Sequence, residues 1–261
     1  MKAELKIITP EWARKILQEK NKGNRAMNAK HVNGLAKEIR EGRWKINGDA
    51  IRINEERLID GQHRLAAIAL TGIAVQSFVI EGLSSDVFDT IDCGILRSPG
   101  HTLGVRGEKN SFRLASALVL TDKYMTGRAD KSVEYSNAEV EKLLEKYPDI
   151  RECLQVSTSC KNLMPPSLLD TCYYIFSKKN KLLADEFVSK VVRGIGLEIG
   201  DPFLLLRERL VKNSTAKAKL TKPYILALCI KAWNACRLGK KLRSLRWRES
   251  GEATETFPTA V

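Results

Sequence analysis

Residues 58–68 change from a strand pattern to a helix pattern within a few positions, and this change constrains the fold more than any other feature. Upstream, residues 50–54 alternate apolar and polar side chains, which is typical of a short strand. From Gln62 onward, apolar residues recur at helical spacing. Gly61 therefore lies where a strand gives way to a helix, and it can adopt backbone angles that a residue with a Cβ resists.

The start of this helix has the features of an anion site. The first turn of a helix has N–H groups without intrahelical partners, and the helix dipole adds partial positive charge there. His63 and Arg64 belong to the same turn. These donors together predict a phosphate site formed by Gly61, Gln62, His63 and Arg64. The alternative is that Asp60 caps the helix and the basic pair is solvated.

The residues around this turn also resemble a known family. The segment Asp60-Gly61-Gln62-His63-Arg64, followed by Leu-Ala-Ala, resembles the signature of the ParB/sulfiredoxin-like superfamily. The resemblance covers about residues 5–100 and extends upstream through Asn24-Arg25, residues 35–39 and Gly42. The Asp-Gly-Gln-His-Arg form is also similar to DndB-type proteins of DNA sulfur modification and to proteins of phages and mobile elements.

The resemblance implies a nucleotide site. In that superfamily the matching segment holds nucleotide phosphates: ParB proteins bind and hydrolyse CTP while loading on DNA, sulfiredoxins use ATP, and a free-serine kinase uses ADP. Sulfiredoxins also need a cysteine at the position of Gln62, and an amide cannot attack as a thiolate can. The resemblance therefore implies CTP or ATP as the ligand, bound with or without Mg²⁺. The glutamine at position 62 excludes sulfiredoxin chemistry.

Carboxylates near this segment are candidates for metal binding and catalysis. Asp89 and Asp92 are three residues apart, so on a helix they share a face, where they could hold Mg²⁺. The alternative is one cap and one solvated side chain. An enzymatic mechanism would need a general base, for which the candidates are Glu38, Glu41, Asp60 and Asp92.

Composition limits the class of protein. The chain has 261 residues, of which 43% are hydrophobic, enough for one large domain or two modest ones. It contains no apolar run long enough to span a membrane and no signal-peptide pattern at its start. Its 6 cysteines form no Cys-x-x-Cys pair, so we expect reduced packing residues in a cytoplasmic protein.

The net charge of +13 is concentrated at the C-terminal end. Residues 201–248 contain 13 Lys and Arg against 2 Asp and Glu, whereas residues 1–100 contain 16 against 13. Such a concentration indicates a polyanionic partner, most simply nucleic acid, and the alternative is a solvated face on a basic protein. The basic residues expected to bind nucleic acid are Lys240, Lys241, Arg243, Arg246 and Arg248.

These patterns predict an α+β protein. We expect a small mixed-sheet domain of the ParB/sulfiredoxin type over residues 1–105, a helical domain over 106–248 and a flexible tail over 249–261. Residues 95–107 are expected to be irregular, as a lid or a linker. The leading hypothesis is a nucleotide-binding, DNA-associated protein. The alternatives are a phosphotransferase or nuclease-like enzyme and a nucleic-acid-binding module with a degenerate pocket. The oligomeric state is open, with a homodimer as one alternative.

Overall fold

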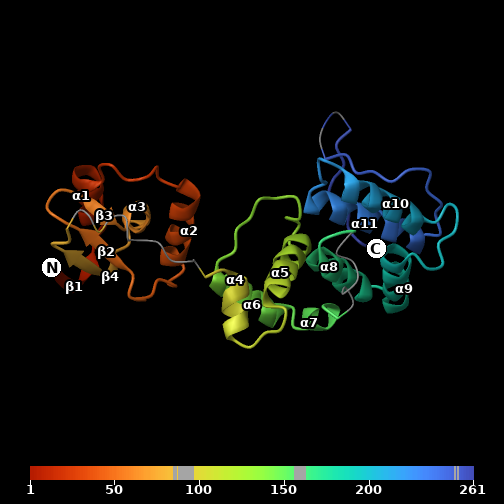
Figure 1. Ribbon diagram of the computed structural model, residues 1–261, viewed down its shortest axis with the longest axis horizontal. Coiled ribbons are helices and arrows are strands. Elements are labelled where there is room, and N and C mark those ends of the chain that lie inside the picture. Colours follow the sequence, from red (N-terminus) through yellow and green to blue (C-terminus); the bar gives the residue numbers. More distant parts are fainter. Residues whose placement is uncertain (85–86, 88–96, 156–162, 250, 252) are drawn as a thin grey trace. The chain divides into compact units, whose positions relative to one another are not determined.

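The chain forms two compact units in the computed structural model, Met1–Ile95 and Leu96–Val261 (Figure 1). The structure describes residues 1–84, 87, 97–155, 163–249, 251 and 253–261. The first unit combines a sheet with helices and the second is helical. The expected α+β class, with a small sheet domain followed by a helical region, is therefore confirmed.

The first unit is organised on a four-stranded mixed sheet with strand order β1-β4-β2-β3. β1 and β4 pair antiparallel, β2 and β4 pair parallel, and β2 and β3 pair antiparallel. The parallel pair places the start of β2 beside the middle of β4, because Ala50 lies opposite Phe78. The strands are β1 (Lys2–Ile8), β2 (Ala50–Ile53), β3 (Leu58–Asp60) and β4 (Val75–Glu81).

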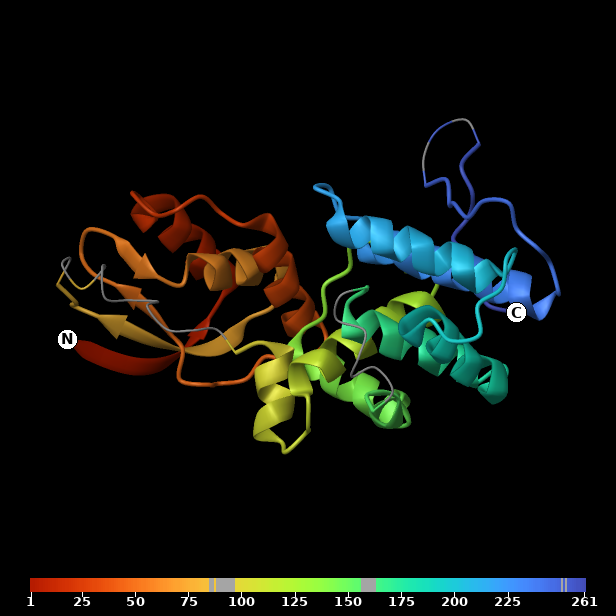
Figure 2. The same ribbon diagram turned by 45° about the vertical axis from the view of Figure 1, so that its right-hand side comes forward.

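Three helices accompany this sheet: α1 (Pro10–Lys20), α2 (Ala29–Arg40) and α3 (Gln62–Thr71). α3 packs against both α1 and α2, and Figure 2 shows α1 and α3 on one side of the sheet. The buried core joins Ile51 and Val79 of the sheet to Leu65 and Ile68 of α3. Local signals define these helices, since the Thr9 side chain accepts a hydrogen bond from the backbone of α1 at the helix start.

The second unit begins earlier than the sequence predicted. The segment expected to be irregular contains α4 (Pro99–Val105), whose N-terminus is capped by Ser98 in a capping box with His101. α4 packs against α5 (Ser111–Met125) and α6 (Asn137–Lys146), so α4 belongs to the helical unit. The elements that follow are α7 (Ile150–Cys153), α8 (Pro166–Ser177), α9 (Lys181–Phe187), η2 (Val188–Arg193), α10 (Pro202–Thr215) and α11 (Lys222–Arg237).

The last residues of the chain pack against α11 instead of forming the flexible tail that the sequence predicted. The indole N–H of Trp233 donates to the carbonyl of Val261 at 3.0 Å. Asn234 binds this segment twice, donating to the carbonyl of Thr259 and accepting from the N–H of Val261. Ala260 is buried. These contacts with α11 hold the last residues in place, and the composition of residues 249–261 gives no sign of them.

Within the described residues, no helix combines the length and apolar character needed to cross a membrane. No disulfide joins the cysteines that the structure describes, Cys153, Cys172, Cys229 and Cys236. Burial raises the pKa of the Cys153 and Cys236 thiols to about 12, so both are protonated near neutral pH. They are packing residues rather than nucleophiles.

Candidate functional site

The strand-to-helix turn at Gly61 has the backbone conformation that the sequence predicted. Gly61 lies between the end of β3 at Asp60 and the start of α3 at Gln62, with φ of 103° and ψ of 10°. Its backbone lies against β2, because an added Cβ would be 3.2 Å from Cγ1 and 3.3 Å from Cα of Ile51. Among the described residues, no side chain caps this end of α3. The helix therefore begins with backbone donors and a positive dipole end, as an anion site requires.

Gln62 and His63 lie differently from the converging donors that the sequence indicated. Both side chains are buried. The Gln62 amide donates to the carbonyl of Arg25 at 3.2 Å, and His63 Nε2 accepts from the N–H of Asn28 at 3.1 Å. They therefore attach the start of α3 to the loop between α1 and α2. Asn24 of the same loop donates to the carbonyl of Leu58 at 2.8 Å.

Arg64 belongs to a cluster with Arg52 and Asp60. Its Nη2 donates to Asp60 Oδ2 and to the carbonyl of Ala50, each at 2.9 Å. Arg52 pairs with the same Asp60 oxygen from the neighbouring strand. The side chains of Asp60, Arg64 and Arg52 are only 13%, 16% and 29% exposed. Two guanidinium groups and one carboxylate leave a formal charge of +1 at the start of α3.

The Arg64 guanidinium is incompletely paired. Its Nη1 is buried and has no hydrogen-bond partner among the residues that the structure describes. The same holds for Oε1 of Gln62. Buried polar atoms are nearly always satisfied in folded proteins, and an unsatisfied donor costs about 1–3 kcal/mol. Both atoms belong to the first turn of α3.

The described carboxylates that the sequence offered as general bases are all in ion pairs. Asp60 binds two arginines, and Glu38 binds Arg43 with both oxygens at 2.7 and 2.8 Å. Glu41 also pairs with Arg43. Arginine side chains therefore contact all three of these candidates.

Asp89 and Asp92, the candidates for a metal site, lie outside the described residues. Among the residues that are described, no group of three or more His, Cys, Asp or Glu side chains has the arrangement of a metal site.

A cavity of about 350 Å³ lies beside Arg64 in the first unit. α2, β4 and the loop that precedes β2 form its walls. Trp44 lines the cavity, and its indole is fixed by a 2.9 Å hydrogen bond from Nε1 to the carbonyl of Gln76. The volume falls within the range of about 300–1,000 Å³ typical of small-molecule sites. The lining residues are Leu35, Glu38, Arg43, Trp44, Lys45, Ile46, Asn47, Asp49, Arg64, Gln76, Ser77 and Phe78.

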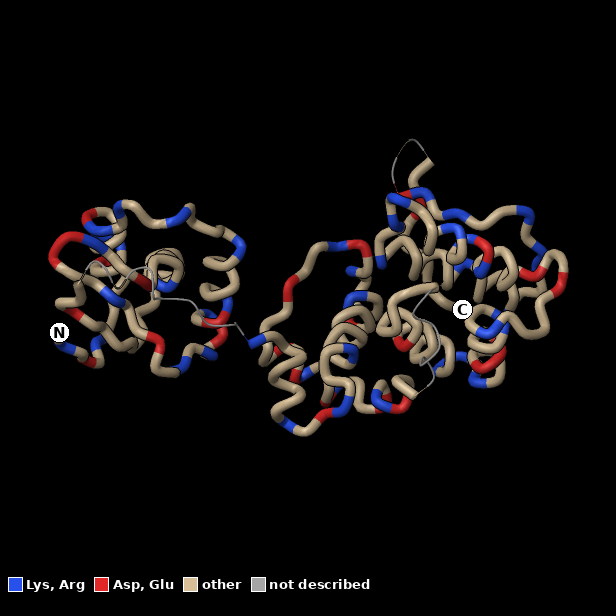
Figure 3. Tube along the Cα trace, viewed as in Figure 1, with Lys and Arg blue, Asp and Glu red and all other residues tan. Residues whose placement is uncertain are grey.

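The basic residues predicted to bind nucleic acid follow α11 in the second unit. Lys240, Lys241, Arg243, Arg246 and Arg248 are all exposed. Trp247, within this stretch, is instead buried against Tyr224 and Phe257. It anchors the segment and is not available for base stacking. In the first unit, acidic residues are interleaved with the basic ones (Figure 3).

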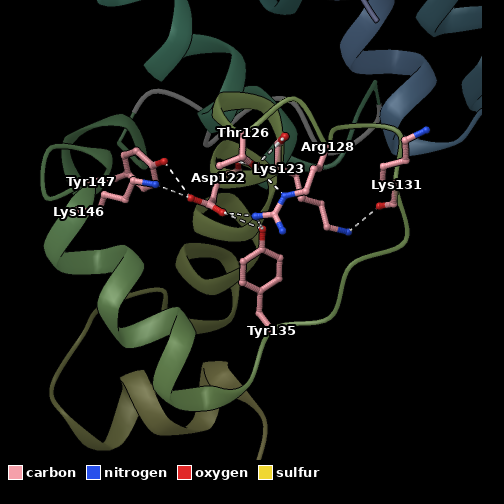
Figure 4. Close-up of polar contacts among 8 residues, drawn as sticks. All are labelled: Asp122, Lys123, Thr126, Arg128, Lys131, Tyr135, Lys146 and Tyr147. Atoms are coloured by element: carbon pink, nitrogen blue, oxygen red, sulfur yellow. Dashed lines mark hydrogen bonds and ion pairs between the residues drawn. The ribbon is translucent and has the colours of Figure 1, made fainter. Parts of the chain in front are cut away.

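Sequence reasoning missed a buried polar cluster around Asp122 on α5 (Figure 4). Its carboxylate accepts hydrogen bonds from the hydroxyls of Tyr135 at 2.8 Å and Tyr147 at 3.0 Å. It also pairs with Lys146 at 2.9 Å and Arg128 at 3.3 Å. The cluster ties α5 to α6 and to the loop between them. The spacing of α5 could have indicated that Asp122 is buried, because it follows the buried Leu114 and Leu118 at intervals of four residues.

The charges of this cluster are coupled. Burial alone would raise the pKa of Asp122, but hydrogen bonds from Lys146, Tyr135 and Tyr147 outweigh it and hold that pKa below its ordinary value. Burial, with the hydrogen bond to Asp122, raises the pKa of Tyr135 to about 12. Hydrogen bonds to Tyr147 and Asp122 also raise the pKa of Lys146. These shifts favour a charged Asp122 and Lys146 beside a neutral Tyr135 near neutral pH, which fits a structural cluster rather than proton transfer.

No family model, no curated protein and no solved structure matches this chain.

Proposed function

We propose that the chain is a nucleotide-binding, DNA-associated protein, with the phosphates of a nucleoside triphosphate bound at the start of α3. The observation that carries the proposal is the cluster of Arg52, Asp60 and Arg64, which holds one excess positive charge beside an uncapped helix N-terminus. Backbone donors, the dipole and an incompletely paired guanidinium all favour an anion at this point. The resemblance to ParB-like proteins supplies the nucleotide, CTP or ATP, together with the Mg²⁺ that accompanies a triphosphate.

The proposed roles differ among the residues of the motif. Gly61 lets the backbone turn so that the N–H groups of the first turn face the ligand. Gln62 and His63 contribute their backbone N–H groups, because their side chains bind the loop between α1 and α2. Arg64 contributes the charge.

DNA association is proposed for the second unit. The basic segment 240–248 offers five exposed cations on a backbone anchored by the buried Trp247. Exposed Lys and Arg bind DNA mainly through phosphates and independently of sequence. The proposal is therefore for backbone binding, without base recognition.

Calorimetric titration with CTP and ATP in the presence of Mg²⁺ tests the nucleotide site. Replacing Arg64→Ala removes a charge-assisted contact worth roughly 1.5–3 kcal/mol, so we expect affinity to fall about tenfold or more. Arg64→Lys keeps the charge but loses the planar guanidinium, so its nucleotide affinity should lie between those of the wild type and Arg64→Ala. Arg14→Ala is the matched control, because Arg14 is an exposed arginine on α1 of the same unit. Equal nucleotide affinity in the wild type and Arg64→Ala would contradict the proposal.

A further inference from the structure

The cavity beside Arg64 has a chemical character different from that of the helix start. Apolar side chains supply much of its wall, namely Leu35, Trp44, Ile46 and Phe78. The Trp44 ring is fixed at its indole N–H, and Arg43 is fixed by both oxygens of Glu38. A flat, apolar group could therefore enter without displacing mobile side chains. Asn47 and Asp49 hydrogen-bond to one another and add polar groups to the lining.

We propose that this cavity binds the base of the nucleotide, beside Trp44, while the phosphates lie at the start of α3. This inference rests on the proposed function and identifies the part of the ligand that the cavity recognises. Arg64 connects the two regions, because it lines the cavity and also belongs to the charged cluster at the helix start. An indole is a suitable neighbour, since aromatic side chains stack on every type of base.

The base and the phosphates can be tested separately. In the wild type, we expect a nucleoside triphosphate to bind at least roughly tenfold more tightly than inorganic triphosphate, the factor that corresponds to about 1.4 kcal/mol. Ser77→Leu is the informative variant, because Ser77 is buried on β4 and lines the cavity. The larger side chain should fill the space for the base. We expect it to abolish the advantage of the nucleoside triphosphate and to leave the affinity for inorganic triphosphate unchanged.

Leu70→Ala is the control, since Leu70 is an exposed residue of α3 that does not line the cavity. It should bind both ligands as the wild type does. A measurement that needs no variant uses a nucleoside triphosphate with a photoreactive base, followed by peptide mapping of the wild-type protein. The proposal expects labelling within residues 35–49 or 76–78.

The outcomes separate this inference from the proposed function. Equal binding of nucleoside triphosphate and inorganic triphosphate, or labelling elsewhere in the chain, overturns the base site and leaves the phosphate site standing. Failure of both ligands to bind the wild type overturns the proposed function, and the base site with it. Loss of inorganic triphosphate binding in a folded Ser77→Leu protein would mean that the cavity holds phosphates instead of the base.

Discussion

Replacing Gly61→Ala should destabilise the first unit by an amount that the structure allows us to divide into two parts. At φ of 103° a residue with a Cβ is strained by about 1–2 kcal/mol. The new Cβ would also lie 3.2 Å from Cγ1 and 3.3 Å from Cα of Ile51. The second atom belongs to the backbone of β2 and cannot rotate away. Overpacking of this kind costs about 1–3 kcal/mol, so we expect a total loss of roughly 2–5 kcal/mol.

Gly72→Ala is the matched control because Gly72 ends the same helix with φ of 70° but has no atom within 4 Å of an added Cβ. It should show only the backbone strain of about 1–2 kcal/mol. Hydrogen exchange of peptides from β2 and α3, measured by mass spectrometry, reports on the first unit separately from the second. If both substitutions cost the same, the close approach of Gly61 to Ile51 would not be a constraint, and our account of this turn would be refuted.

Two further predictions concern the second unit. Asp122→Asn should lower the free energy of unfolding by about 2–3 kcal/mol at neutral pH. The pKa of Asp122 is lower in the folded protein than in the unfolded chain. Its contribution to the free energy of unfolding is therefore complete above the unfolded pKa and is lost as pH falls through the folded pKa. Urea unfolding should accordingly give the wild type and Asp122→Asn the same stability in acid. Changing Arg243, Arg246 and Arg248 together to Ala should flatten the slope of log K against log salt for duplex DNA by about two or more. An unchanged slope in filter binding would mean that this segment is only solvated.

Local signals in the sequence were sufficient for most elements of the first unit. The alternation of β2, the helical spacing after Gln62 and the break at Gly61 are properties of neighbouring residues, and the structure places the strand, turn and helix there. Trp233 follows Leu226 and Ile230 at helical spacing, which predicts a core position, and it is fully buried. In each case the chain within about one or two turns determines the outcome.

Contacts between distant segments could not be predicted in the same way. His63 was expected to face a ligand, but its ring accepts a hydrogen bond from Asn28, 35 residues earlier. Asp60 was a candidate cap or base, and it instead pairs with Arg52 across the strand pair and with Arg64 one helical turn later. The docking of Val261 on Trp233 likewise joins residues far apart in the sequence. Spacing identifies which residues can be neighbours on one element, but not which element faces another.

The charge of the Arg52, Asp60 and Arg64 cluster makes a stronger argument than the motif from which the prediction began. A short His-Arg motif at a helix start can be solvated, and it then has no bearing on ligands. Two arginines that share one carboxylate, partly buried beside the positive end of a helix, are an unfavourable arrangement for folding alone, because buried charge must be compensated. An anion at the start of α3 would supply that compensation together with partners for the remaining donors. The sequence argument for a phosphate site rested on the identity of the four residues 61–64. The structural argument rests on the excess positive charge of Arg52, Asp60 and Arg64, and of these three only Arg64 was predicted to bind phosphate.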